Sequence, residues 1–268
     1  VKEIPVESTL VLGATHALVL LDDGEIVGDP MEKNTLKAIG WTVGKNDRVH
    51  SIENPANSLR ILRRFQFSSA LKRSSSIADV HGRTLVAVKG APETLKHMIT
   101  NVPPQYEETY KSFTRTGSRV LALGFKFLED NITPAKINKI SRENVEKDLI
   151  FGGFLVFHCP LKADAVETVK MLNESSHRVV MITGDNPLTA VHVAREVAIV
   201  ERETLILDLP EESHGSHELV WRSVDETTII PVKSSEPLNI SLFEEYDLCV
   251  TGYALAKLSN HEHIVDLV

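Results

Sequence analysis

The sequence is poor in cysteine and aromatic residues and contains no long hydrophobic run. Its two cysteines, Cys159 and Cys249, are too few and too far apart for a disulfide scaffold or a zinc site, which favours a reducing compartment. The longest apolar run, 149–157, has nine residues and two of them are glycines. A membrane-spanning helix needs about 20 apolar residues. The sequence therefore predicts no membrane span, and no signal peptide is recognisable at its start.

An excess of positive charge is also missing. Lys and Arg total 29 and Asp and Glu total 37, so the net charge is −8. That balance argues against a general nucleic-acid or anionic-membrane binder, although it leaves room for a local basic pocket. With 268 residues the chain is long enough for one large or two ordinary domains. Because it begins with Val rather than Met, we expect a piece of a longer protein.

The first half of the chain predicts an antiparallel sheet with flanking helices. Asp29 and Pro30 fit the start of a helix, Glu32 fits a capping box, and Leu36, Ile39 and Val43 recur at helical spacing. Apolar residues of one parity predict a strand over 59–67, with one face buried. Further strands are expected over 75–80, 84–88 and 119–127, with a turn at Gly82 and a helix from about Glu93.

The second half predicts a doubly wound α/β domain with a parallel sheet. Buried strands are expected over 150–157, 178–182 and 204–209, separated by helices over 163–174 and 186–199. The polar stretch 211–236 is expected to be a loop, followed by a strand over 248–251 and a short helix. We place the domain boundary near Asp148, after a charged helical segment over 134–147, which gives domains 1–148 and 149–268.

Thr183, Gly184 and Asp185 follow a predicted parallel strand and precede a helix. Ligands of open α/β sheets bind at that edge, and a Thr hydroxyl, a Gly backbone and a helix N-terminus can hold a phosphate. For this tripeptide alone, a simple strand-to-helix turn with a capping residue is the commoner explanation.

Several residues of the first half could form a nucleotide site. Phe67 ends a strand shortly before Lys72, and an aromatic ring beside a lysine suits a base pocket with a phosphate channel. Lys89 and Gly90 stand at a strand end before a rigid turn, and Arg119 begins another strand. Taken singly, each has an ordinary alternative: a core Phe for Phe67 and solvated surface positions for Lys89 and Arg119.

The order and spacing of these motifs resemble the cytosolic catalytic part of a P-type ATPase. The resemblance covers almost the whole chain and rests on segments 28–32, 67–73, 89–93, 119–123, 159–162 and 181–185. The residues of segments 159–164 and 177–190 resemble those of one branch of this family, the fifth class, subgroup A, of the endoplasmic reticulum, in a fungal-type form. The resemblance implies a nucleotide-binding domain inserted into a phosphorylation domain of haloacid-dehalogenase fold.

The resemblance also implies a role for each motif residue and implies ATP and Mg²⁺ as ligands. Phe67 would stack on adenine, Glu32 would line the adenine pocket, and Lys72, Lys89 and Gly90 would flank the nucleotide. Arg119 would reach the phosphates. Thr183, Gly184 and Asp185 would face the phosphoryl group and its Mg²⁺, and Lys162 matches the basic residue of the hinge motif.

The chain departs from the family pattern in ways that limit its chemistry. The Asp-Lys-Thr-Gly-Thr motif with the phosphorylated Asp and the Gly-Asp-Gly-x-Asn-Asp motif are both absent from the sequence. Cys159 stands where most members have Asp, which puts that hinge contact in doubt. We therefore expect a nucleotide-binding piece that is inactive alone, lacks a complete Mg²⁺ site, and depends on the actuator and membrane domains of its own parent chain.

Three functions remain open. The first is the ATP-binding part of a transport ATPase at the cytosolic face of the endoplasmic reticulum membrane, which the resemblance links to removal of transmembrane helices or to transport of a cation such as manganese. The second is a soluble haloacid-dehalogenase-type phosphatase with a cap domain. The third is a nucleotide-binding module without chemistry of its own. Missing nucleophile motifs count against the second.

Overall fold

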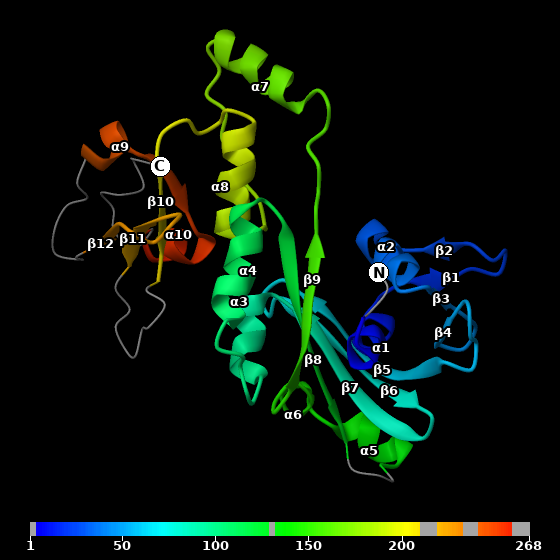
Figure 1. Ribbon diagram of the computed structural model, residues 1–268. Coiled ribbons are helices and arrows are strands. Elements are labelled where there is room, and N and C mark those ends of the chain that lie inside the picture. Colours follow the sequence, from blue (N-terminus) through cyan, green and yellow to red (C-terminus); the bar gives the residue numbers. More distant parts are fainter. Residues whose placement is uncertain (1–3, 129–131, 210–218, 233–240, 259–268) are drawn as a thin grey trace. The chain divides into compact units, whose positions relative to one another are not determined.

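The computed structural model describes residues 4–128, 132–209, 219–232 and 241–258 (Figure 1). The chain divides into two compact units. Unit 1 comprises residues 1–110 and 120–156, and unit 2 comprises residues 111–119 and 157–268. The polypeptide therefore passes from one unit to the other three times. The predicted boundary near Asp148 stays a prediction.

Unit 1 is built on a seven-stranded sheet in the order β3-β4-β5-β6-β7-β8-β9. Adjacent strands from β3 to β8 pair antiparallel, as the sequence predicted for this half of the chain. The strands are β3 (Trp41–Val43), β4 (Arg48–Ser51), β5 (Ser58–Ser68), β6 (Arg73–Val80), β7 (Arg83–Gly90), β8 (Arg119–Phe127) and β9 (Ile150–Phe157).

A tight turn joins β6 to β7, and its position confirms the prediction around Gly82. Both turn residues have positive φ, +51° at His81 and +86° at Gly82. Two central residues with positive φ match the right-handed twist of the flanking strands, and Gly adopts this conformation without steric cost. The eight residue pairs from Arg73↔Gly90 to Val80↔Arg83 then align without interruption.

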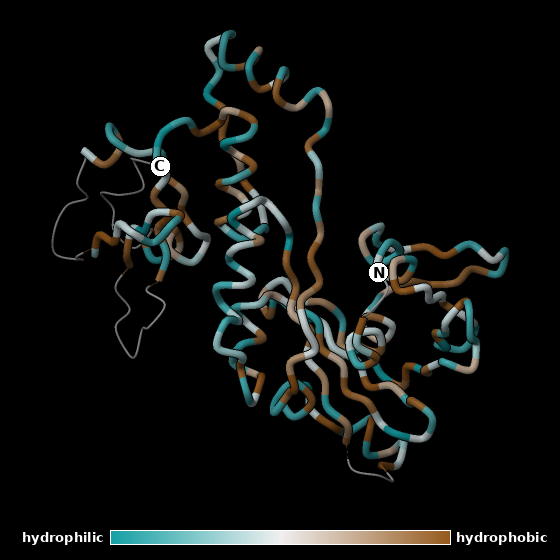
Figure 2. The backbone as a smooth tube through the Cα atoms, viewed as in Figure 1, coloured by the Kyte–Doolittle hydropathy of each residue, from teal (hydrophilic) through white to brown (hydrophobic). Residues whose placement is uncertain are grey.

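The two faces of this sheet bury two separate cores. Ala78, Leu85 and Ala87 pack on one face with residues of α1 (Val6–Ala14) and α2 (Pro30–Ala38). Their neighbours Ile77, Val86 and Val88 pack on the other face. There they meet α3 (Pro92–Leu95), the first part of α4 (Tyr106–Arg115), α5 (Pro134–Lys139) and α6 (Arg142–Val145). Figure 2 shows hydrophobic residues concentrated along these strands, as alternation between two buried faces requires. The small elements β1 (Val19–Leu20), β2 (Ile26–Val27) and η1 (Lys96–Met98) complete unit 1.

Strand β5 spans the predicted residues, but its side chains do not share one face. The register with β6 shifts once between Ile61 and Arg63 and again between Phe65 and Ser68. Each shift adds one residue to β5, which turns the following side chains to the opposite face. Leu59 and Ile61 therefore belong to the α1 core, whereas Phe65 packs against the core on the other face.

Two further predictions for this part of the chain were wrong. Residues 150–157 form a strand, but β9 lies at the edge of the unit 1 sheet and none of its residues is buried. The apolar run identified a strand without identifying its sheet. Val43 lies in β3 rather than in the preceding helix, because α2 ends at Ala38 and Gly40 follows with a positive φ of +68°.

Unit 2 contains a four-stranded mixed sheet in the order β12-β11-β10-β13. Strand β10 (Thr204–Asp208) pairs parallel with β13 (Asp247–Val250) and antiparallel with β11 (Val220–Ser223), which pairs antiparallel with β12 (Ile229–Pro231). Leu205, Ile206 and Leu207 are fully buried. Helices α7 (Ala165–Glu174), α8 (Pro187–Glu196), α9 (Ser241–Glu245) and α10 (Gly252–Leu258) complete the unit.

Local signals in unit 2 predicted its helices better than its sheet. Asn186 caps α8 by accepting a hydrogen bond from the Leu188 amide, as predicted. The expected loop over 211–236 was wrong where it is described, because β11 and β12 lie within it; residues 210–218 and 233–240 lie outside the described residues. The sheet is mixed rather than fully parallel in the described part of the chain, and a doubly wound domain stays a proposal.

The predicted buried strand over 178–182 is not a strand in this structure. Ile182 is 96% exposed and Val180 is 71% exposed. The expected buried face of α7 is also exposed, including Val166 and Met171. A parallel strand buries its side chains only when sheet neighbours and covering helices are in place. No strand of the described residues pairs with 178–182.

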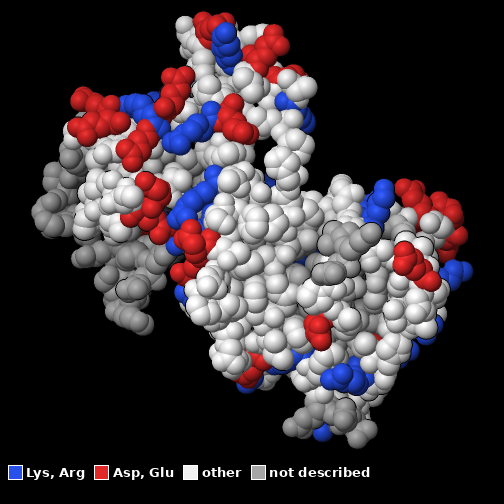
Figure 3. All heavy atoms as spheres, viewed as in Figure 1, with Lys and Arg blue, Asp and Glu red and all other residues white. Residues whose placement is uncertain are grey.

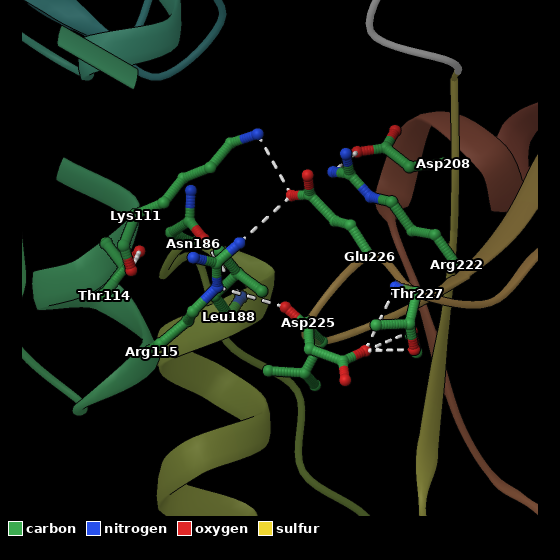
Figure 4. Close-up of polar contacts among 12 residues, drawn as sticks. Lys111, Thr114, Arg115, Asn186, Leu188, Asp208, Arg222, Asp225, Glu226 and Thr227 are labelled. Carbon is green, nitrogen blue, oxygen red and sulfur yellow. Dashed lines mark hydrogen bonds and ion pairs between the residues drawn. The ribbon is translucent and has the colours of Figure 1, made fainter. Parts of the chain in front are cut away.

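A partly buried polar cluster holds the turn between β11 and β12 to the end of α4, within unit 2 (Figure 4). Lys111 Nζ lies 3.0 Å from Glu226 Oε1, and Arg115 Nη2 lies 3.4 Å from the same oxygen. Arg115 Nε also donates a hydrogen bond to the Val224 carbonyl. The Lys111 side chain is only 6% exposed, so its pairing with Glu226 offsets the cost of burying the ammonium.

In the part of the chain that the structure describes, every helix is too short or too polar to cross a bilayer.

Candidate functional site

A small pocket in unit 1 lies where β5, β6 and the segment after α1 meet. It is lined by residues 14–17, Glu32, 64–67 and 74–76, and we call it the β5 pocket. Two predicted site residues, Glu32 and Phe67, are thus brought to one place. Lys89 contacts the pocket through Glu32.

The Glu32 carboxylate is partly buried and uses both oxygens. Oε1 accepts a hydrogen bond from Lys89 Nζ at 3.0 Å, and Oε2 accepts one from the Ala17 amide at 2.8 Å. The side chains of Lys89 and Glu32 are 12% and 20% exposed. Asp29 alone caps α2, accepting hydrogen bonds from the amides of Met31 and Glu32. The predicted capping-box role of Glu32 was therefore wrong, because its carboxylate is turned toward Lys89 and the chain after α1.

Phe67 stands at the pocket with most of its ring in solvent. It is 65% exposed and lies in the second register shift of β5, where Gln66 and Phe67 together face Ser74. The alternative explanation of a buried core Phe is therefore wrong for Phe67. Phe65 is the residue that packs against the core there; it is partly buried, and the Arg63 guanidinium lies 4.4 Å from its ring centroid.

Lys72 and Gly90 lie next to one another beside β6, and neither belongs to the described lining of the β5 pocket. Lys72 Nζ is 3.3 Å from Glu93 Oε1 in an exposed pair. A Cβ atom on Gly90 would lie 2.6 Å from Arg73 Cβ and 2.7 Å from the Lys72 carbonyl oxygen. Close packing of the chain therefore requires Gly90, independently of any contact with a nucleotide.

His16 is the pocket residue that sequence reasoning missed. It is 94% buried, its Nδ1 accepts a hydrogen bond from the Leu18 amide at 3.0 Å, and its buried Nε2 has no partner among the described residues. Burial lowers the pKa of His16 to about 4, with the nearby Arg64 guanidinium as the next cause. The ring is therefore neutral at physiological pH, with its proton on Nε2. A single His between two apolar segments carries no sequence signal for such a role.

The residues predicted to contact phosphate gather in unit 2. Arg119 Nε lies 2.8 Å from Asp185 Oδ1, and Arg119 Nη2 lies 2.9 Å from Asp185 Oδ2. Thr183 Oγ1 accepts a hydrogen bond from the Asp185 amide at 3.1 Å, which shapes the turn into α8. Gly184 and Lys162 are exposed. Arg119 and Asp185 thus form a bidentate ion pair. Because both carboxylate oxygens contact the guanidinium, Asp185 is less available to other ligands.

A Mg²⁺ site is not formed by the described residues. They contain no group of three His, Cys, Asp or Glu side chains that could hold a metal ion. Asp185 supplies a single carboxylate, and both of its oxygens contact Arg119. Because Mg²⁺ prefers several oxygen ligands in octahedral geometry, these residues do not fit a resident ion, and no chemical step is derived through one.

Charge is mixed across the surface of unit 2. On the face shown in Figure 3, Lys and Arg side chains of this unit are interspersed with Asp and Glu. Asp247 illustrates the mixing, because it accepts hydrogen bonds from the amides of Glu201 and Arg202 and from the Arg202 guanidinium.

The sequence matches the family model of the P-type ATPase cytoplasmic domain N over residues 18–164, more than half of the chain. The chain belongs to the P-type ATPase family. The matched residues include the whole seven-stranded sheet and most of the residues that line the β5 pocket. Membership of the family confirms the resemblance on which the expected roles of Glu32, Phe67 and Lys89 rest, but the roles themselves stay predictions.

Several P-type ATPases are highly similar to the chain. It is 54% identical over 277 residues to the endoplasmic reticulum transmembrane helix translocase of Aspergillus fumigatus, covering 97% of this chain and 21% of the relative. The Saccharomyces cerevisiae protein of the same description is 55% identical over 268 residues, covering 99% and 22%. A probable manganese-transporting ATPase of Arabidopsis thaliana is 42% identical over 257 residues, covering 96% and 21%. The chain spans about a fifth of the length of these relatives.

Proposed function

We propose that this chain is the ATP-binding cytosolic part of a P-type ATPase of the endoplasmic reticulum membrane, with adenine bound in the β5 pocket. The observation that carries the proposal is the exposed Phe67 ring at a pocket that is also lined by Glu32, the partly buried partner of Lys89. An exposed aromatic ring is costly to leave in water and provides a stacking platform for a base. The Lys89 ammonium lies at the edge of this pocket, where Glu32 neutralises its charge in the structure.

In the full-length parent, the reaction requires groups that this chain lacks. An aspartate outside the chain attacks the γ-phosphorus of ATP, the bond to the bridging oxygen breaks, and ADP leaves with that oxygen. Water later cleaves the aspartyl-phosphate. Arg119 supplies positive charge toward the phosphates. The turn formed by Thr183, Gly184 and Asp185 faces the transferred group, and Lys162 is the basic residue of the hinge motif. ATP binding with Arg119 would separate that guanidinium from Asp185.

The transport activity that this cycle drives is inferred from the relatives. Two of the relatives above are described as transmembrane helix translocases of the endoplasmic reticulum, and identities above 50% favour that activity for the parent of this chain. The Arabidopsis relative, at 42%, keeps cation transport such as manganese as the second candidate. The transported substrate binds outside the residues of this chain in either case.

Other parts of the parent chain are the proposed partners of unit 2. Val180, Ile182 and Met171 are all more than half exposed, and Figure 2 shows hydrophobic residues along α7. Such a group of exposed apolar side chains is typical of a surface that another segment covers. The phosphorylation domain of haloacid-dehalogenase fold would then be completed by segments outside this chain, and its carboxyl-terminal part would be the residues of unit 2 that follow β9.

The missing nucleophile also supports a narrower function for the chain alone, that of a nucleotide-binding module without chemistry. Incubation with γ-labelled ATP tests the missing nucleophile: the isolated chain should retain no acid-stable label. Stoichiometric labelling would contradict the assignment of the nucleophile to a segment outside these residues, and would reopen the phosphatase alternative.

Replacing Phe67 tests the pocket directly. Phe67→Ala should weaken ATP binding about tenfold or more in calorimetric titration, because base–aromatic stacking contributes roughly 1–3 kcal/mol. Its melting temperature should hardly change, since the ring is mostly in water. Phe113→Ala is the control, because Phe113 is 40% exposed and lies outside the described pocket lining. Equal ATP affinity in Phe67→Ala and the unmodified chain would overturn the proposal.

A further inference from the structure

The β5 pocket contains a hydrogen-bond donor with no acceptor among the described residues. His16 lines the pocket, and its Nδ1 is occupied by the Leu18 amide at 3.0 Å. The remaining proton must therefore reside on Nε2, which is buried and has no partner in the described part of the chain. Buried polar groups are almost always hydrogen-bonded, so such an exception requires an explanation.

We propose that His16 Nε2–H donates a hydrogen bond to a ring nitrogen of adenine and helps the pocket select that base. This inference rests on the proposed ATP site and adds to it a recognition group that touches the base. The donor is fixed by the chain itself, because the Leu18 amide holds the imidazole in one tautomer.

The neighbouring groups match the edge pattern of adenine. Each oxygen of a carboxylate can accept two hydrogen bonds. Glu32 uses one position on each oxygen, toward Lys89 and Ala17, and so retains capacity for an amino group. Adenine presents an N6 amino donor beside the acceptors N1 and N7. One acceptor on Glu32 and one donor on His16 suit that pair of groups.

Guanine presents a different pattern to the same two residues. Its O6 is an acceptor where adenine has the N6 amino donor, and its N7 is also an acceptor. The Glu32 carboxylate would then face an oxygen instead of an amino group. Two acceptors placed together without a proton are unfavourable, so GTP should bind less tightly than ATP.

Access to His16 requires a small movement of the pocket wall. Nε2 has almost no exposed surface in the structure, so a side chain beside it must rotate before the base can reach it. Gln66 and Arg64 line the same pocket and have long side chains. Gln66 lies in the register shift of β5, where the ladder with β6 is interrupted.

The decisive variant removes the donor but keeps the local fold. In His16→Asn, the side-chain oxygen can still accept from the amide two residues later, which is the usual geometry of an Asx turn. The Nε2–H group is lost. His50→Asn is the matched control, because His50 also has a buried ring nitrogen without a partner in the described chain but lies outside the described pocket lining.

Binding is measured by calorimetry with ATP, GTP and the 1-, 3- and 7-deaza analogues of ATP, each of which lacks one ring nitrogen. We expect the unmodified chain to bind one deaza analogue about tenfold more weakly than ATP, equivalent to about 1.4 kcal/mol. His16→Asn should bind ATP and that analogue equally, each about tenfold more weakly than the unmodified chain binds ATP. His50→Asn should behave like the unmodified chain.

Other results would overturn the role of His16 but leave the proposed ATP site standing. If His16→Asn binds ATP as tightly as the unmodified chain, or if no deaza substitution weakens binding, His16 Nε2 is satisfied by water rather than by adenine. A uniform loss for ATP and all three analogues in His16→Asn would show a purely structural role. By contrast, an unmodified chain that binds no ATP, or a Phe67→Ala variant with unchanged affinity, would overturn the proposed function itself.

Discussion

Lys89 Nζ lies 3.0 Å from Glu32 Oε1, which joins the seventh strand of the chain to its second helix at the edge of the β5 pocket. The two residues are 57 positions apart in the sequence. Sequence reasoning named both as nucleotide-site candidates, but it treated them as independent. Their pairing means that a change in one alters the charge and position of the other.

Lys89→Ala should therefore lower both stability and ATP affinity. Loss of a hydrogen bond to a charged, mostly buried group costs about 1.5–3 kcal/mol of unfolding free energy. Lys96→Ala is the control, because Lys96 pairs with Glu107 and both side chains are about 40% exposed, so its loss should cost less than about 1 kcal/mol. Denaturant unfolding and ATP titration check both variants. Reduced stability with normal affinity in Lys89→Ala would remove Lys89 from the nucleotide site.

Glu146→Gln should strongly destabilise unit 1. The Glu146 side chain is 1% exposed and accepts hydrogen bonds from Arg73 Nε at 2.6 Å, Arg142 Nε at 2.7 Å and Ser75 Oγ at 2.7 Å. Removing its charge leaves two guanidinium groups without their counter-ion, at a cost of about 3 kcal/mol. Glu143→Gln in α6, at an exposed position three residues earlier, should change the unfolding midpoint little. Similar midpoints in urea for the two variants would contradict the prediction.

Gly90→Ala and Gly184→Ala should differ sharply in stability. A methyl group at Gly90 would overlap Arg73 Cβ, the Lys72 carbonyl oxygen and Leu95 Cδ1, whereas at Gly184 it would meet no atom within 4 Å. Overpacking costs about 1–3 kcal/mol, so only Gly90→Ala should lower the melting temperature. A stability loss in Gly184→Ala would show that other atoms pack against the turn before α8 in solution.

His16 should make the stability of unit 1 depend on pH in the acid range. Burial and the Arg64 and Lys89 cations lower the pKa of His16 to about 4 from 6.5, while Glu32 and Asp47 act in the opposite direction. Between these values the unfolded chain binds the proton more readily than the folded one. Above pH 6.5, His16 is neutral in both states and does not lower the free energy of unfolding. As the pH falls toward 4, protonation of His16 in the unfolded chain lowers that free energy by about 3 kcal/mol. Unfolding titrations of the chain and of His16→Asn at pH 7, 5.5 and 4.5 isolate this contribution; parallel pH profiles would contradict it.

Local signals predicted much of the fold, and non-local ones account for the errors. The starts of α2 and α8 and the turn at His81-Gly82 depend on capping residues and backbone φ, which neighbouring residues in the sequence determine. The strand expected over 178–182 depended on sheet neighbours, and an apolar run does not show whether they are present. The same limit applies to β9, whose sheet was assigned wrongly.

The candidate site shows the same division. Phe67 and Glu32 were found through motif spacing, and the structure brings both to one pocket. His16 was missed because its significance lies in a buried ring nitrogen without a partner among the described residues, which only three-dimensional contacts reveal. The Arg119–Asp185 pair was also not predicted, since their separation of 66 positions in the sequence hides their proximity.

The exposure of Phe67 depends on the one extra residue that β5 contains at its second register shift. Between Phe65↔Ser75 and Ser68↔Arg73, β5 contributes two residues and β6 contributes one. Deleting Gln66 would restore equal numbers and a regular ladder, and Phe67 would then take a place in the pleat opposite Ser74. The chain could fold with every other contact of β6 and β7 unchanged and still lose its stacking platform. An alignment gap of one residue at this position in any homologue would therefore mark a protein that recognises its ligand differently.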